Sequence, residues 1–255
     1  MKKIMFGLAA AIAMVAAADI ESSNIVGYTT GASGAQNNFV TIPFAQVGYN
    51  TSDIQQIKIG DNGAGTIGWG GETFDVWAGA PTVVDGSSFI YYDASMDPGG
   101  VATDYYWGDD VGNKASFSVA AGQGVVLGLT EGLTVTYAGE IAVSNVNFTA
   151  IQGNNFAGNN FAMPIDIQAI KVSDDGAGMI GWGGETFDIW EGAPTVKEGS
   201  SYIYYDASMD PDGVATDYYW GDDEGNMVKY AIPAGQGFVL GLNEGLSVTI
   251  VSPLK

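Results

Sequence analysis

Two acidic segments of the chain carry residue types suited to binding a hard cation. Each combines aspartates with asparagine and glycine, and the whole chain contains neither histidine nor cysteine. Calcium takes about six to eight oxygen ligands, mostly carboxylates and carbonyls, from loops that glycine allows to bend tightly. Each segment is therefore a candidate calcium site. The candidate ligands are Asp93, Asp97, Asp104, Asp109 and Asp110 in the first segment and Asp206, Asp210, Asp212, Asp217, Asp222 and Asp223 in the second.

The same aspartates have a second interpretation, as turn residues whose carboxylates cap backbone amides. Their spacing does not match an EF-hand loop, in which the ligands alternate and a glutamate closes the loop. If calcium binds, Asp212, which stands where the first segment has Gly99, predicts a tighter second site. A similar acidic, glycine-rich pair lies at 61–65 and 174–178. Both interpretations stay open for all of these segments.

The tryptophans form three matched pairs, which indicates either glycan binding or an aromatic core. Rings beside carboxylates and amides are typical of sugar sites, but large rings also fill the core of a small β domain. We expect Trp77 and Trp190 to be buried or half-buried, because they alternate with apolar residues. Trp107 and Trp220 precede a Gly-Asp-Asp run, so we expect them to be more exposed. The glycan-binding candidates are Trp107, Trp220, Trp69 and Trp182.

The composition excludes most catalytic mechanisms. Without histidine the chain has no imidazole base, no Ser-His-Asp triad and no zinc site of the usual kind. Glycoside hydrolysis is the chemistry that remains, because it needs only two carboxyl groups about 5 to 10 Å apart. Glu72 or Glu185 with one of the loop aspartates could form such a pair. We expect a non-catalytic protein, with a carboxylate-based glycosidase as the less favoured alternative.

The N-terminal segment has the organisation of a secretory signal peptide, over residues 1–18. Lys2 and Lys3 precede an apolar stretch that ends in an Ala-Ala-Ala cleavage site before Asp19. The stretch is shorter than the roughly 20 residues that a membrane span needs. We therefore expect export, with no membrane span after cleavage. The periplasm, the cell surface and the medium are all open as destinations.

The charge of the chain limits its partners. It has 29 acidic and 8 basic residues, for a formal net charge of −21. Such a surface repels phosphate backbones and anionic membranes, so we expect no nucleic-acid partner. Glycans and other copies of the chain are the partners that this composition permits.

The chain is an internal duplication. Residues 57–133 and 170–246 align without a gap at an offset of 113, and 57 of these 77 positions are identical. The upstream segments align at an offset of 121, Ile25 on Val146, so the first copy has about eight (121 − 113) extra residues. We expect two tandem homologous domains, residues 19–141 (repeat 1) and 142–255 (repeat 2).

The sequence predicts short strands around the acidic and tryptophan-containing segments. Apolar and hydroxyl residues alternate over 133–137 and 246–250, as in half-buried strands. Further strands are expected at 39–44, 88–92 and 124–129, and one helical turn, capped by Thr51 or Ser52, at 51–57. The fold class is therefore all-β, with two β-sandwich or barrel-like domains. The alternative is one pseudo-symmetric β domain built from both repeats.

Three motifs, SSNIVGY (22–28), NFVTIPF (38–44) and AAGQGVVL (120–127), occur in this order. In this respect the chain resembles a set of uncharacterised secreted β-rich proteins of Gram-negative bacteria. The resemblance implies an exported β domain and no particular activity. Together these observations predict a non-catalytic structural or assembly component of the cell envelope or extracellular space. The alternative is a carbohydrate-binding module, with or without calcium.

Overall fold

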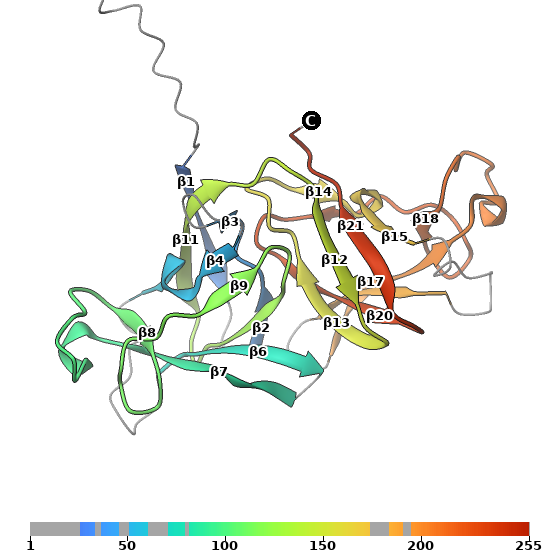
Figure 1. The fold of residues 1–255 in the computed structure, drawn as a ribbon. Coiled ribbons are helices and arrows are strands. Elements are labelled where there is room, and N and C mark those ends of the chain that lie inside the picture. Colours follow the sequence, from blue (N-terminus) through green and yellow to red (C-terminus); the bar gives the residue numbers. More distant parts are fainter. Residues whose placement is uncertain are drawn as a thin grey trace, which may run out of the picture.

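A computed structural model describes residues 26–33, 37–45, 51–60, 71–79, 82–173, 184–190 and 195–254. Every strand pairing there is antiparallel, and the helical segments are single 3-10 turns, which confirms the all-β prediction. The sheets of the described residues do not close into a barrel. Figure 1 shows repeat 1 in blue to green and repeat 2 in yellow to red, side by side. The signal peptide predicted at 1–18 lies outside the described residues.

Repeat 1 contains a five-stranded sheet, a four-stranded sheet and a strand pair. The five-stranded sheet has the order β2 (Asn37–Val40), β10 (Val125–Gly128), β6 (Thr73–Gly79), β7 (Thr82–Tyr92), β8 (Tyr106–Gly108). In the four-stranded sheet, β11 (Leu133–Ile141) pairs with β1 (Val26–Ser33), β3 (Phe44–Ala45) and β5 (Ile57–Ile59). The strand pair is β4 (Thr51–Asp53) with β9 (Ser118–Ala120).

Repeat 2 has the same plan with one strand fewer. Its five-stranded sheet has the order β13 (Gly153–Gly158), β20 (Gly237–Leu242), β16 (Thr186–Trp190), β17 (Val196–Tyr205), β18 (Tyr219–Gly221). Its second sheet has the order β12 (Val146–Ala150), β21 (Leu246–Ile250), β15 (Ile170–Val172). The strand pair is β14 (Ile165–Asp166) with β19 (Ala231–Ile232).

The alternation of residue types along the strands accounts for the core of each repeat. In β11, Leu133, Val135 and Tyr137 are buried, and the hydroxyl residues between them are more exposed. These three residues share one cluster with Trp107 and Leu127 from elsewhere in repeat 1. Repeat 2 has a separate cluster of matching composition. Each repeat therefore buries apolar side chains of its two larger sheets in a core of its own, as a sandwich does.

The predicted helical turn is present, but its cap differs from the prediction. The 3-10 turn η1 (Ile54–Gln56) begins after Asp53, whose Oδ1 accepts a hydrogen bond from the Gln55 N–H at 2.8 Å. Ser52 instead donates its hydroxyl proton to the Phe44 carbonyl at 2.6 Å. Asp166 caps the matching turn η4 (Ile167–Ala169) in the same way. The carboxylate took the capping role because the strand β4 continues as far as Asp53.

In the N-terminal part of each repeat, the strand pairing gives an alignment of the two repeats that differs from the offset of 121 predicted from sequence. Thr29 pairs with Tyr137, and Val146 pairs with Ile250. Because Tyr137 and Ile250 are equivalent positions (250 − 137 = 113), Val146 corresponds to Thr29, an offset of 117 (146 − 29). The alignment of Val146 with Ile25 is therefore wrong for the strands. The extra length of repeat 1 is four residues (117 − 113), and β3 lies in this part of repeat 1.

The two repeats meet in a third core with approximate two-fold symmetry. Phe39 and Phe156 stack at a centroid distance of 5.4 Å. Each also packs edge-on against both junction tryptophans, Trp77 and Trp190, at 5.3 to 5.9 Å. Phe39 and Trp190 are buried in this cluster, with Val126 and Val239. We call this cluster the junction core.

Backbone hydrogen bonds across the junction follow the same symmetry. The Thr41 N–H donates to the Gly235 carbonyl, and the Gly158 N–H donates to the Gly122 carbonyl, both at 2.9 Å. Gly122 and Gly235 have φ values of 76° and 74°, which favour glycine. A Cβ on Gly124 would lie 2.7 Å from the Ala157 carbonyl oxygen of the other repeat. The Gly-Gln-Gly part of the AAGQGVVL motif is thus where the repeats cross.

No helix among the described residues is long and apolar enough to cross a membrane.

Candidate functional site

The central aspartate of each acidic segment holds its own loop together. The Asp97 carboxylate accepts hydrogen bonds from the N–H groups of Gly99, Val101 and Ala102, at 2.7 to 2.9 Å. These bonds, with that from Ala102 the strongest, lower the pKa of Asp97. Asp210 accepts the matching three bonds in repeat 2. This is the arrangement that the turn interpretation predicts.

Asp212 and Gly99 occupy equivalent positions in the two loops, and the tighter calcium site predicted from Asp212 stays a prediction. The Asp212 N–H donates to Asp210 at 3.0 Å, as the Gly99 N–H donates to Asp97 at 2.9 Å. The two positions therefore have the same backbone role, whichever side chain they carry.

Other aspartates of these segments are also engaged within their loops. Asp93 caps the 3-10 turn η3 (Ala94–Met96), and a hydrogen bond from the Ser95 side chain is the largest of the effects that lower its pKa. Asp206 does the same for η6 (Ala207–Met209). Asp104 and Asp217 form exposed ion pairs with Lys58 and Lys171, at 3.4 and 3.3 Å.

The Gly-Asp-Asp runs form a second capped loop in each repeat. Asp109 accepts hydrogen bonds from the N–H groups of Val111 and Asn113 and from the Asn113 side-chain amide, at 2.8 to 3.1 Å. Burial alone would raise the pKa of Asp109, but these bonds outweigh it, so that the pKa is lowered. Asp222 repeats the pattern with Asn226 and Glu224.

Two buried tyrosines lie beside these runs. Burial, together with the charges of Asp109 and Asp110, raises the pKa of Tyr92. Burial and the charges of Asp222 and Asp223 raise that of Tyr205. In the described part of the chain, no group of three or more His, Cys, Asp or Glu side chains could hold a metal ion. The carboxylates that were candidate ligands are thus largely committed to backbone amides and lysines.

The prediction that Trp107 and Trp220 are exposed is wrong. Both side chains are 0% exposed. The Trp107 indole N–H donates to the Ile57 carbonyl at 2.9 Å, and that of Trp220 donates to Ile170 at 2.8 Å. The flanking glycine and aspartates belong to the loop beyond each short strand, while the ring points into the core. Neither ring has a face free for a sugar.

Trp77 and Trp190 lie in the junction core, which agrees with the expectation of burial or half-burial. Trp190 is buried, and Trp77 is half-buried. The indole N–H of each has no hydrogen-bond partner among the described residues. Trp69 and Trp182, and the acidic pair at 61–65 and 174–178, lie outside the described residues.

The glutamates considered for glycoside hydrolysis are buried supports for turns. Glu72 is 2% exposed and accepts bonds from the Thr130 N–H and hydroxyl, both at 2.7 Å. Glu185 accepts from the Asn243 N–H at 2.7 Å, and burial raises its pKa. Each glutamate fastens the turn that follows β10 or β20 to the sheet. A carboxylate held in this way is not positioned beside an open surface.

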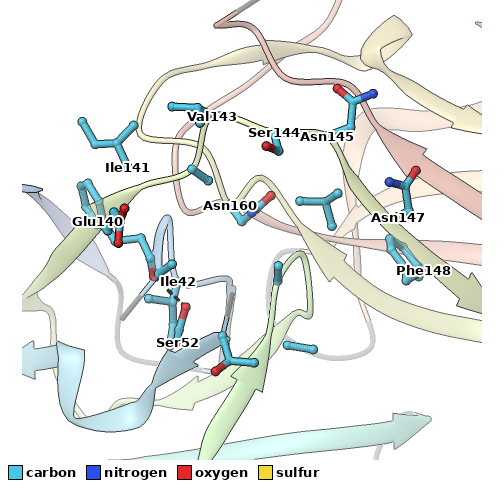
Figure 2. A pocket seen from close by; sticks show the side chains of 17 residues that line it. Ile42, Ser52, Glu140, Ile141, Val143, Ser144, Asn145, Asn147, Phe148 and Asn160 are labelled. Carbon is cyan, nitrogen blue, oxygen red and sulfur yellow. Dashed lines mark hydrogen bonds between the residues drawn. The ribbon is translucent and has the colours of Figure 1, made fainter. Parts of the chain in front are cut away.

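A hollow with polar groups in its walls lies between the repeats, and it was not predicted. It has a volume of about 640 Å³. One wall comes from repeat 1 and includes Ile42, Ser52 and Ala120. The other wall comes from β12 and from the linker between the repeats, Ala142–Asn145. Figure 2 shows the linker residues Val143 and Ser144 above Asn160, which lies between the two walls. We call this space the inter-repeat groove.

A second hollow of about 310 Å³ shares Ala120, Ala121 and Phe148 with the inter-repeat groove. Trp77 and Phe156 of the junction core line it, together with the polar side chains of Gln123, Thr149, Asn154 and Asn155. The two hollows therefore adjoin and run along one side of the junction.

Asn160 is the unusual residue of the inter-repeat groove. It is 5% exposed, and its Oδ1 has no hydrogen-bond partner among the described residues. The adjacent Asn159 is 0% exposed and fully used, with its amide donating to the Met163, Ile232 and Pro233 carbonyls at 2.9 to 3.1 Å. A buried carbonyl oxygen without a partner costs about 1 to 3 kcal/mol. Sequence reasoning missed Asn160 because an Asn-Asn pair in a glycine-rich segment reads as an ordinary loop.

A comparison with protein-family models, curated proteins and solved structures found no match for this chain.

Proposed function

We propose that the protein is a non-catalytic structural component, exported to the cell envelope or extracellular space, that assembles through the free edge of β1. The observation that carries this proposal is the place of β1 in its sheet. This eight-residue strand pairs with β11 on one side, and no described strand pairs with its other side. A long unpaired edge offers a row of N–H and C=O groups to a strand of another chain.

The engagement of the chemically capable residues supports a non-catalytic role. Glu72 is tied to Thr130, and Asp97 to three amides of its own loop. Trp107 is enclosed in the core. A catalytic carboxyl group needs an approach for substrate and a second carboxyl group at a set distance. These residues instead stabilise the fold.

The junction core supports a role that depends on shape. Two isolated antiparallel β-bridges connect the repeats here, Val40 with Gln236 and Gln123 with Ala157. Aromatic packing with backbone pairing on both sides joins the repeats into one continuous unit. An assembly built from such units transmits the geometry of one contact to the next.

The mass of the purified protein in solution tests the proposal. We expect size-exclusion chromatography with light scattering to show species larger than one chain as concentration rises, and electron microscopy to show ordered assemblies. Two neighbouring proline variants, Thr29→Pro and Thr30→Pro, examine the edge itself. Successive residues of a strand direct their N–H groups to opposite sides, so one variant removes a bond to β11 and the other alters the free edge.

We expect the variant at the residue whose N–H points away from β11 to keep the melting temperature of the wild type and to stay monomeric. The variant at the residue whose N–H points toward β11 should unfold at lower temperature, because it loses a ladder bond. A wild-type protein that is monomeric at every concentration would exclude assembly through β1.

Carbohydrate binding is the second candidate function, and the inter-repeat groove is the observation that favours it.

A further inference from the structure

We infer that the inter-repeat groove, with the second hollow beside it, is a binding site for a neutral, hydroxyl-rich ligand, a saccharide chain. The inference is independent of the assembly proposed for β1, because the groove and β1 involve different residues. It concerns a site formed by both repeats together, not by either repeat alone.

The size of the site fits an extended ligand. Small-molecule pockets in proteins are about 300 to 1,000 Å³. The groove has about 640 Å³ and the second hollow about 310 Å³, with Phe148 in the wall of both. A ligand of several sugar units could therefore lie along the junction from Ser144 to Trp77. The half-buried Phe148 and Trp77 add apolar ring surface, which sugar C–H groups favour.

Asn160 supplies the polar contact that the ligand would complete. Its Oδ1 lies in a nearly closed position with no partner among the described residues, while Asn159 next to it donates to three carbonyls and accepts from the Phe161 N–H. Figure 2 shows the Asn160 side chain directed into the groove, between Ile42 and Ser144. A hydroxyl group donates to a carboxamide oxygen and accepts from its NH₂ group. A polyol therefore satisfies Asn160 in both respects.

The charge of the walls selects a neutral ligand. Among the described residues that line the two hollows, Glu140 is the one that carries a charge. The described lining contains no lysine, so it offers no counter-charge to phosphate or carboxylate groups of a ligand. The formal net charge of −21 adds a general repulsion of anions. The remaining polar lining consists of hydroxyl and amide groups, as in Ser144, Asn147 and Thr149.

The approximate two-fold symmetry does not reproduce the site. At the strand offset of 117, the counterpart of Asn160 is Pro43 (160 − 117), which has no amide. The linker Ala142–Asn145 forms one wall of the groove, and it crosses between the repeats on one side only. Trp190, the symmetric partner of Trp77, lines neither hollow. The chain therefore contains its own matched controls.

Isothermal titration of the purified protein with neutral oligosaccharides is the test. The probes are hexasaccharides of glucose, mannose and N-acetylglucosamine, and we expect saturable binding of at least one. Asn160→Ala should weaken that binding about tenfold, the effect of one lost hydrogen bond in a closed site. Trp77→Phe, which reduces the ring surface in the second hollow, should also weaken it, and the control Trp190→Phe should leave it unchanged.

Melting temperatures separate a binding residue from a structural one. Asn160→Ala should not lower the melting temperature, because it removes a buried polar group that has no partner. Asn159→Ala should lower it clearly, because several buried carbonyls lose their donor. A fall in melting temperature for Asn160→Ala equal to that for Asn159→Ala would show that Asn160 serves the fold, and would overturn the inference.

Three further results would overturn it. One is the absence of binding by all three hexasaccharides. Another is binding that Asn160→Ala does not weaken. The third concerns a neutral peptide of strand-forming sequence, Thr-Val-Thr-Val-Thr. Binding of this peptide that Asn160→Ala abolishes, together with no binding of the hexasaccharides, would show that the groove is a peptide site.

Discussion

The interiors of the two repeats are near copies of each other, whereas the two sides of their junction differ. In the interiors, Gln55 donates to the Trp107 and Ala115 carbonyls and Gln168 to those of Trp220 and Val228, all at 2.8 Å. The bonds persist although alanine has become valine, because they use backbone carbonyls. Duplication has thus copied the supports of the fold.

The junction shows the opposite behaviour around a shared centre. Its aromatic stacking and crossing backbone bonds are symmetric, but the linker and Asn160 occur on one side. A site that depends on both repeats cannot be copied by duplicating one of them. Agreement between the repeats therefore marks structural residues, and a unique site is to be sought where the agreement ends.

The largest effect should come from removing the enclosed indoles. Trp220→Ala and Trp107→Ala should each cost about 3 to 5 kcal/mol in the free energy of unfolding, since each leaves a large cavity. Denaturant-induced unfolding measures this cost. If the interiors are equivalent, the two variants will lose similar amounts. A large loss of unfolding free energy in one repeat and a negligible loss in the other would show that the interiors are not equivalent.

A somewhat smaller effect is expected at the junction core. Phe39→Ala should cost about 3 kcal/mol, and Phe156→Ala, at the symmetric position, should cost a similar amount. Because the junction core couples the repeats, either change should also separate one unfolding transition into two, as calorimetry would record. Phe74→Ala, inside the core of repeat 1, is the control, since it leaves the junction untouched. A single transition in all three variants would show that coupling does not depend on these rings.

The smallest effect should appear in acid. Their loop amides lower the folded-state pKa of Asp97 and Asp210. A depressed pKa contributes stability that is present above the unfolded-state pKa and is lost as pH falls through the folded-state value. Melting temperature should therefore fall below about pH 4, and by less in the double variant Asp97→Asn and Asp210→Asn.

Glu185, whose pKa shift has the opposite sign, provides a control for the acid limb. Burial raises its folded-state pKa, so its protonation favours the folded state as pH falls. Below the unfolded-state pKa both states are protonated, so this gain lies above about pH 4.3, and Glu185→Gln should remove it there without changing the acid limb. An acid limb unaffected by the double variant Asp97→Asn and Asp210→Asn would show that the capped loops do not control acid stability.

Much of the fold could be predicted from the sequence, because it depends on local patterns. Period-two alternation located β11 and β21, and the Asp-Gly and Asp-Pro turns formed as capped loops. Strand register upstream could not be predicted in this way. The similarity of Ile25 and Val146 suggested an offset of 121, whereas the pairing of β1 and β12 with their partners requires 117. Register is decided by the partner strand, which a sequence similarity does not include.

For the candidate site residues, too, the sequence revealed one part and the structure another. The residue types of the acidic loops were evident in the sequence, but their use was not, because a carboxylate that caps an amide and one that awaits a cation have the same neighbours in the chain. Trp107 shows this most clearly, since a polar run follows a ring that is 0% exposed.

The all-β class, the duplication, the acidic surface and the exclusion of imidazole chemistry all follow from the sequence alone. These depend on composition and on contacts between near neighbours. The three-dimensional arrangement was needed to see that the Gly-Gln-Gly turns join the repeats and that the Asn160 Oδ1 has no partner among the described residues. Both depend on which distant strands and linker residues surround a group. Hydrogen-bond satisfaction is a property of that complete environment, so no local pattern could have revealed it.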